Sequence, residues 1–327
     1  MTDSRAIPEG TALTLPAEPA RRYTMNIALI GPGAMGLLFG GYLSKHHDVT
    51  LIGSNPENMR YIEEHGVAIL ATDGTEETFR PHATADASHL GPADLVLLFV
   101  KSGITGKVLE QNRNLIGPDT ILMTLQNGAG HENVLKKYTD EEHVLIGTTQ
   151  QGSSRRTPVS IYHSGLGSTS IGAITGDSSR FARVAEAFSV CGFPCEVSDQ
   201  VRGMIWNKLM INASSSVLSG VLQVPQGYVA SNPAAWSIAE NLITEICAVA
   251  AAEGYRFDAA DQIARIRKHL EKAPDGLTSI YADLKAGRIT EAPVINGAVV
   301  DAARRLGIPV PTHETILALV HAMEERA

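Results

Sequence analysis

Three polar side chains recur at helical spacing in an otherwise apolar segment. Lys208, Asn212 and Ser216 are four residues apart, so an α-helix would place them on one face, about 6 Å apart along its axis. A solvent-facing stripe is the ordinary explanation of such a pattern. Here the segment carries few other charges, and a lysine in apolar surroundings is costly to bury without a partner, so we favour a face turned toward a ligand cleft. An ammonium group there can stabilise negative charge on a carbonyl oxygen and deliver a proton to it.

A second candidate site is a glycine-rich turn near the start of the chain. Its G-x-G-x-x-G pattern directly follows a predicted strand and opens a predicted helix, which is the context in which this pattern binds a dinucleotide. The first glycine permits a sharp turn, the second lets the backbone approach a pyrophosphate, and the third lets the helix pack on the strand. The amides at the helix start then face the anion. The candidate cofactor-binding residues here are Gly31, Pro32, Gly33, Ala34, Met35 and Gly36.

The end of the second predicted strand bears on which dinucleotide is bound. NAD sites usually carry an acidic residue there, which contacts the ribose 2′-hydroxyl. This chain has Gly53, Ser54 and Asn55 instead, so no carboxylate repels a 2′-phosphate. Ser54 and Asn55 can donate hydrogen bonds and Arg60 is close in sequence, although both residues also suit a helix cap before Pro56. The sequence favours NADP, with NAD as the alternative.

Two kinds of fold must position these residues. The first half alternates short apolar runs with helical segments, and residues 94–100 are apolar on both faces, as in a central parallel strand. This alternation predicts an α/β domain with a Rossmann-type, doubly wound parallel sheet. Helices are predicted from the glycine-rich turn to about 45 and at 56–65. Strands are predicted at 26–30, 48–52, 67–71, 78–81, 94–100, 120–125 and 143–149, with a hairpin of 159–163 and 168–174 at the sheet edge.

The strand signal ends near residue 199, and an all-α segment follows. Asn232, Pro233 and Gly254 bound one strong helix at its cap, first turn and end. Helices are predicted at 201–221, 233–253, 258–270, 277–286, 294–306 and 312–325. We therefore expect a disordered N-terminal extension (1–24), a dinucleotide-binding domain (25–198) and a helical substrate and catalytic domain (199–327).

Composition excludes several classes of function. The 327 residues include 27 Lys and Arg against 35 Asp and Glu, a net charge of −8, which argues against nucleic-acid binding. The sequence has no apolar run of about 18 residues, so no membrane span is expected. Three cysteines and no metal-ligand spacing indicate a cytoplasmic protein without a metal site. We expect a small-molecule substrate, and the apolar helical domain could support a homodimer.

Several further motifs occur in a specific order. They are GPGAMG at 31–36, VK at 100–101, LQNG at 125–128, WNKLMIN at 206–212, TS at 278–279 and TEAPVING at 290–297. With these motifs the chain resembles the ketopantoate reductase family over nearly all of residues 25–320. The resemblance implies reduction of the 2-keto group of ketopantoate to pantoate with NADPH, a step toward pantothenate and coenzyme A.

The resemblance also assigns roles residue by residue. Lys208 matches the family's catalytic lysine, the general acid, and Glu291 matches its acidic partner. Lys101 and Asn127 match residues beside the cofactor, and both follow predicted strands, where a solvated strand end and an ordinary turn are the simpler explanations. The substrate-binding positions are Asn212, Ser216 and Ser279.

Two positions depart from the family pattern. Ser216 stands where the family usually has a second Asn, and Pro293 stands where it usually has Asp. The reaction type is unaffected, but the substrate is left open. A paralogous reductase acting on another 2-keto acid, or on an imine-type substrate as in opine dehydrogenases, is the alternative. A third hypothesis, a non-catalytic NADP sensor, fits poorly with the retained Lys208 and Glu291.

Overall fold

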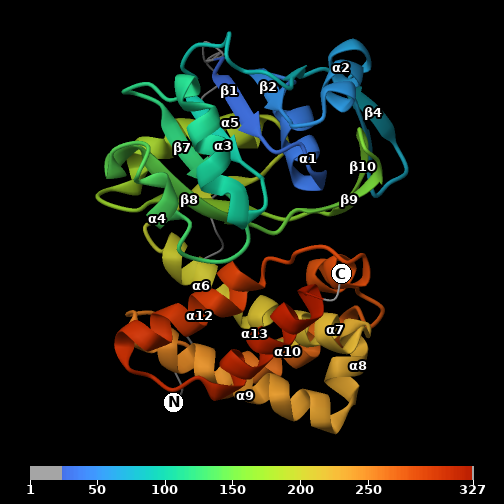
Figure 1. Cartoon of the computed structure of the whole chain (residues 1–327), viewed down its shortest axis with the longest axis vertical. Coiled ribbons are helices and arrows are strands. Elements are labelled where there is room, and N and C mark those ends of the chain that lie inside the picture. The colour runs from blue at the N-terminus through green and yellow to red at the C-terminus, as the bar shows by residue number, and fades with distance from the viewer. Residues whose placement is uncertain (1–23, 326–327) are drawn as a thin grey trace, which may run out of the picture.

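The structure is a computed structural model that describes residues 24–325. It has two parts, one built around a sheet and one built from helices alone, which lie one above the other (Figure 1). The first part extends to strand β12 (Cys195–Val197), and the second begins with helix α6 (Val201–Ile211). The predicted N-terminal extension lies outside the described residues, except for Thr24.

An eight-stranded sheet carries the first part, with strands in the order β12-β11-β8-β7-β6-β1-β2-β5. Every adjacent pair is parallel except β11 with β8. The predicted Rossmann-type sheet followed by helices is therefore confirmed. Besides β12, its strands are β1 (Asn26–Ile30), β2 (Asp48–Ile52), β5 (His82–Thr84), β6 (Leu95–Leu98), β7 (Ile121–Thr124), β8 (Val144–Thr149) and β11 (Thr169–Ala173).

Both faces of the central strands are buried because helices cover both. In β1, Ile27 and Leu29 pack with residues of α1 and α5, whereas Ala28 and Ile30 pack with residues of α3 and α4. Side chains alternate between the two faces, so a strand covered on both sides is apolar at every position. The helices of this part are α1 (Ala34–Leu43), α2 (Pro56–His65), α3 (Thr105–Gln111), α4 (Glu132–Leu135) and α5 (Ala182–Val190).

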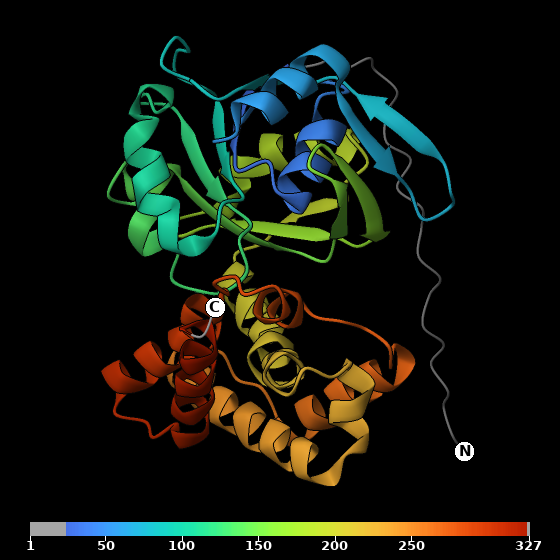
Figure 2. The ribbon, with the colours of Figure 1, turned by 45° about the vertical axis from the view of Figure 1, so that its right-hand side comes forward.

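A second, four-stranded sheet has the order β4-β3-β10-β9. Its strands are β3 (Val67–Leu70), β4 (Glu76–Phe79), β9 (Gly152–Thr157) and β10 (Ser160–Gly165). The pairs β3–β4 and β9–β10 are antiparallel, and β3–β10 is parallel. Strand β9 lies beside α1, on the side of this part that faces the helices (Figures 1 and 2).

The predicted hairpin of 159–163 and 168–174 is wrong. Strand β10 pairs with β9 and β3, whereas β11 pairs with β8 and β12 in the larger sheet. The true hairpin partner, β9, has the sequence GSSRRT, which lacks the apolar alternation that identifies a strand. The strand predicted at 78–81 is also shifted, because β4 ends at Phe79 and a separate strand, β5, follows Pro81.

The second part packs around α9 (Pro233–Ala252), which Asn232 caps by accepting hydrogen bonds from the amides of Ala234 and Ala235. By length and composition α9 is the one helix of residues 24–325 that could cross a membrane. Half of it is buried, and its apolar residues form the centre of this part's core. The other helices are α6, α7 (Val217–Leu222), α8 (Gln226–Ser231), α10 (Ala259–Lys272), α11 (Ser279–Lys285), α12 (Ala292–Leu306) and α13 (Pro311–Glu324).

The helix predicted at 201–221 is not uniform. A π-helical turn, η5 (Asn212–Ser216), separates α6 from α7. Such a turn has more residues per turn than an α-helix and is often found at functional sites. Residues after the turn are therefore rotated relative to the positions that an unbroken α-helix would give them.

Candidate active site

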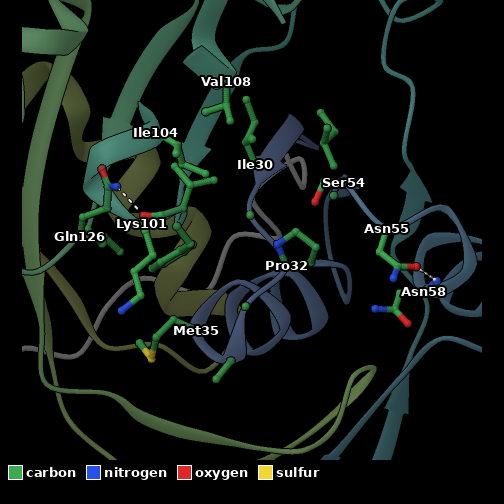
Figure 3. Close-up of a pocket in the computed structure, with 18 of the residues that line it drawn as sticks. Ile30, Pro32, Met35, Ser54, Asn55, Asn58, Lys101, Ile104, Val108 and Gln126 are labelled. Atoms are coloured by element: carbon green, nitrogen blue, oxygen red, sulfur yellow. Dashed lines mark hydrogen bonds between the residues drawn. The ribbon is translucent and has the colours of Figure 1, made fainter. Parts of the chain in front are cut away.

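A cavity of about 1010 Å³ lies at the carboxyl edge of the central parallel strands. The segments after β1, β2, β6 and β7 and the end of β8 line it from the sheet-containing part. Lys208, Ser279 and Glu291 line it from the helical part. Figure 3 shows part of the lining, including Pro32 of the glycine-rich turn and Lys101 just after β6. This edge is where open α/β sheets bind their ligands.

The glycine-rich turn has the geometry of a phosphate-binding loop. Gly31 has a φ of +101°, and a Cβ there would lie 2.7 Å from the amide nitrogen of Val100. A Cβ on Gly36 would lie 2.1 Å from the carbonyl oxygen of Gly31. At Gly33 a Cβ would meet nothing within 4 Å, so the cavity leaves open space beside the start of α1. These observations fit a dinucleotide whose pyrophosphate lies against the helix start.

Five of the six predicted loop residues line the cavity, and Gly36 does not. Gly36 acts through the close contact between α1 and β1 instead, as its place in the pattern predicts. The lining residues of the turn are Gly31, Pro32, Gly33, Ala34 and Met35.

The segment after β2 also lines the cavity. Ser54 and Asn55 are exposed and belong to the lining, and the Asn55 Oδ1 accepts a hydrogen bond of 2.9 Å from the amide of Asn58. Asn55 therefore caps α2 as well, which was the simpler explanation of its type and position. Arg60 is not among the described residues that line the cavity.

Lys208 projects from α6 into this cavity. Its Nζ donates a hydrogen bond of 2.8 Å to the carbonyl oxygen of Thr149, the last residue of β8. Burial lowers the pKa of Lys208 to about 8, while the nearby charge of Glu291 acts in the opposite direction. A lysine with this pKa is mostly protonated at neutral pH and releases its proton readily.

Glu291 immediately precedes α12, beside the turn that follows β7. The amide of Ala129 donates a hydrogen bond of 3.0 Å to the carbonyl oxygen of Val294, which holds this turn against α12. Burial raises the pKa of Glu291. The charges of Lys101 and Lys208 and a hydrogen bond from Asn127 act in the opposite direction. The structure thus brings Asn127, Lys208 and Glu291 together from three elements.

Lys101 is held by an ion pair that joins the two parts of the molecule. Its Nζ lies 2.6 Å from Oδ2 of Asp283 on α11, and Nε of Arg288 lies 3.0 Å from Oδ1 of the same carboxylate. The Asp283 residue is 6% exposed. No local sequence pattern predicts Asp283 as a site residue, because its partner Lys101 lies 182 positions away.

The predicted substrate-binding residues do not all reach the main cavity. Ser279 lines it, whereas Asn212 lines a small adjoining pocket together with Lys208 and Asn127. Ser216 lines neither of these two pockets. Its hydroxyl accepts a hydrogen bond of 3.2 Å from Nε2 of Gln226. Residues eight apart on an α-helix already differ by about 80° around its axis, so Lys208 and Ser216 need not face the same cavity.

The lining includes residues that the sequence analysis did not identify. Thr149 ends a parallel strand, so the rule that ligands bind at the carboxyl edge could have found it. Gln151 also lines the cavity, and its Oε1 lies 2.8 Å from Nε2 of the buried His163. Arg155 lies on β9, which was not predicted as a strand. Within residues 24–325 the structure assembles no group of three or more His, Cys, Asp and Glu residues that could hold a metal ion.

Comparisons with known proteins agree with this geometry. The chain matches the family "Ketopantoate reductase PanE/ApbA" over residues 27–176 and "Ketopantoate reductase PanE/ApbA C terminal" over residues 200–324. It is 33% identical over 299 residues to the 2-dehydropantoate 2-reductase of Halobacterium salinarum, covering 90% of this chain and 98% of that protein.

Solved structures show the same similarity. A ternary structure of D-mandelate dehydrogenase with NADH and anilino(oxo)acetate has a TM-score of 0.86 and 28% identity, covering 92% of this chain and 98% of the other. A PanE/ApbA family ketopantoate reductase from Ralstonia eutropha has a TM-score of 0.82 and 30% identity, covering 92% and 98%. The chain is an oxidoreductase that acts on CH–OH groups, and it belongs to the ketopantoate reductase family.

Proposed function

We propose that this protein reduces the 2-keto group of ketopantoate to the hydroxyl of pantoate with NADPH, and that Lys208 is the general acid. The observation that carries the proposal is the position of the Lys208 amine, which lines the same cavity as the glycine-rich turn. Its pKa of about 8 suits a group that must be charged at neutral pH and then give up a proton.

The chain's own residues account for the proton and for orientation. When bound, the nicotinamide cofactor supplies the hydride. Lys208 faces the negative charge that develops on the keto oxygen and donates its proton there. The Thr149 carbonyl holds the Lys208 amine in place. Glu291 either orients that amine or accepts a hydrogen bond from the substrate hydroxyl. Ser279 and Asn212 would hold the rest of the substrate.

The cofactor would bind along the edge of the sheet. The turn at 31–36 would hold the pyrophosphate, Ser54 and Asn55 the adenosine ribose, and Lys101 and Asn127 the nicotinamide end. The segment after β2 contains no acidic residue between Gly53 and Asn55, which supports NADPH over NADH. The NADH complex of D-mandelate dehydrogenase supports a nicotinamide cofactor of either kind.

The test is an absorbance assay of nicotinamide oxidation with purified enzyme and ketopantoate. NADPH consumption that depends on ketopantoate, and that is faster than NADH consumption, is expected. Oxidation of neither cofactor with ketopantoate would refute this substrate. A cytoplasmic location, which the three free cysteines favour, and a homodimer belong to the same proposal.

A second candidate function is reduction of another 2-keto acid. Two observations favour it: the similarity to D-mandelate dehydrogenase, at a TM-score of 0.86, and Ser216, whose hydroxyl is engaged by Gln226 rather than facing the main cavity. A panel of 2-keto acids, including benzoylformate and pyruvate, separates the two candidates by their kcat/KM values. A higher kcat/KM for another member of the panel than for ketopantoate would favour this candidate.

A further inference from the structure

One arginine borders the glycine-rich turn from a different sheet. Arg155 lies on β9, lines the cavity, and donates a hydrogen bond of 2.8 Å from Nη2 to the carbonyl oxygen of Pro32. Two residues earlier on the strand, the Ser153 hydroxyl donates a hydrogen bond of 2.9 Å to the carbonyl oxygen of Ala34. Residues two apart on a strand share a face, so β9 presents this face to the turn and to the start of α1.

The neighbouring arginine points the other way. Arg156 forms an ion pair with Glu76 on β4, on the opposite face of β9. Arg155, in contrast, has no carboxylate within ion-pair distance among residues 24–325. Of these two adjacent arginines, Arg156 is therefore neutralised by an acid, whereas Arg155 brings an unneutralised positive charge to the cavity.

The other cations of the cavity are already engaged. Three Lys and Arg side chains line it in the described part of the chain: Lys101, Arg155 and Lys208. Lys101 pairs with Asp283, and the Lys208 amine donates its hydrogen bond to the Thr149 carbonyl. Arg155 is exposed, and among residues 24–325 only Pro32 holds it, through one amino group, so the rest of its planar guanidinium is available to an anion. That geometry suits the paired oxygens of a phosphate.

We propose that Arg155 binds a phosphate of the dinucleotide, closing over the glycine-rich turn from β9. This inference rests on the dinucleotide binding in the proposed function and adds a residue to it. The turn supplies backbone amides and the N-terminus of α1, and Arg155 supplies the full positive charge that the turn lacks. The anion is either the pyrophosphate, common to NAD and NADP, or the 2′-phosphate of NADP alone.

The experiment measures NADP⁺ and NAD⁺ binding by isothermal titration calorimetry. The variants are Arg155→Ala, Arg155→Lys and, as the matched control, Arg156→Ala. We expect Arg155→Ala to weaken binding about 10- to 100-fold, as loss of a charge-assisted hydrogen bond does. Arg155→Lys should recover part of the affinity, because lysine keeps the positive charge but lacks the planar guanidinium that binds two oxygens at once. Arg156→Ala should change it less than about twofold, as a surface substitution away from the ligand does.

The two dinucleotides identify the phosphate. An equal loss for NAD⁺ and NADP⁺ assigns the pyrophosphate, and a loss confined to NADP⁺ assigns the 2′-phosphate. Unchanged affinity for both in Arg155→Ala, or an equal loss in Arg156→Ala, would overturn the proposal. Urea unfolding checks that each variant is folded. Turnover of ketopantoate by the unmodified enzyme is measured separately, so a failed role for Arg155 and a failed proposed function give different results.

Discussion

Removal of the Lys208 amine is the most direct test of the chemistry. In Lys208→Ala the helix α6 remains intact, since alanine is the best helix former. The substitution deletes the amine that donates a 2.8 Å hydrogen bond to the Thr149 carbonyl at the end of β8. The glycine-rich turn lies elsewhere in the cavity, so the variant should bind NADP⁺ as the unmodified enzyme does.

The expected loss follows from the protonation state of Lys208. With a pKa of about 8, roughly nine-tenths of the side chains carry the proton at pH 7. Nearly every enzyme molecule is therefore competent to donate at that pH, and the variant loses the whole contribution of the acid. A positioned general acid is worth about 10²- to 10⁴-fold in rate, or about 3 to 5 kcal/mol.

The pH dependence gives a second, independent readout. Reduction requires the ammonium form, so kcat/KM of the unmodified enzyme should fall as pH rises through about 8. Lys208→Arg keeps a positive charge that does not titrate in this pH range, so this decline should disappear from its profile. Both are measured from NADPH absorbance between pH 6 and 9.5, with calorimetry as the control for binding.

Two results would refute this reasoning. One is turnover in Lys208→Ala within about threefold of the unmodified enzyme, too small a change for a lost general acid. The other is a kcat/KM that does not fall anywhere near pH 8 in the unmodified enzyme. Lost turnover together with lost NADP⁺ binding would instead mean that Lys208 holds the cofactor.

Four further outcomes are expected. Glu291→Gln removes a charge that raises the pKa of Lys208, so the decline of kcat/KM should move to lower pH; an unmoved profile would contradict the coupling. Asp283→Asn weakens the ion pairs that join the two parts and should lower the free energy of unfolding by about 1–2 kcal/mol, measured in urea. Gly33→Ala should keep its stability but bind NADP⁺ less tightly, because its Cβ would enter open cavity. Gly36→Ala should lose about 1–3 kcal/mol of stability through overpacking; equal behaviour of the two glycine variants would contradict the roles assigned to them.

Local sequence patterns were sufficient for most of the fold. Strands β1 and β2 and helices α2 and α9 occupy nearly the predicted residues, because continuous apolar runs and well-placed caps identify such elements without reference to the rest of the chain. The glycine-rich turn is recognised by its compact pattern, and the close contact at Gly36 involves the nearby Gly31 and Leu29, whereas the close contact at Gly31 involves Phe99 and Val100 after β6.

The small sheet shows where those patterns fail. Strand β9 is polar along its length and lies at a sheet edge, so it buries too little apolar surface to leave a periodic signal. Because β9 was not predicted, β10 was expected to pair with the wrong strand. It also hid Arg155, whose proximity to Pro32 depends on 123 positions of intervening chain.

The sequence by itself determined the fold class, the phosphate-binding turn and the residue types of the site, because each depends on short-range periodicity or on a compact motif. Only the tertiary structure decided which side chains meet. It paired Lys101 with Asp283 across the two parts, set Lys208 against the Thr149 carbonyl, and paired the Ser216 hydroxyl with Gln226. These contacts result from how the sheet and the helices pack together, and no spacing along the chain encodes that packing.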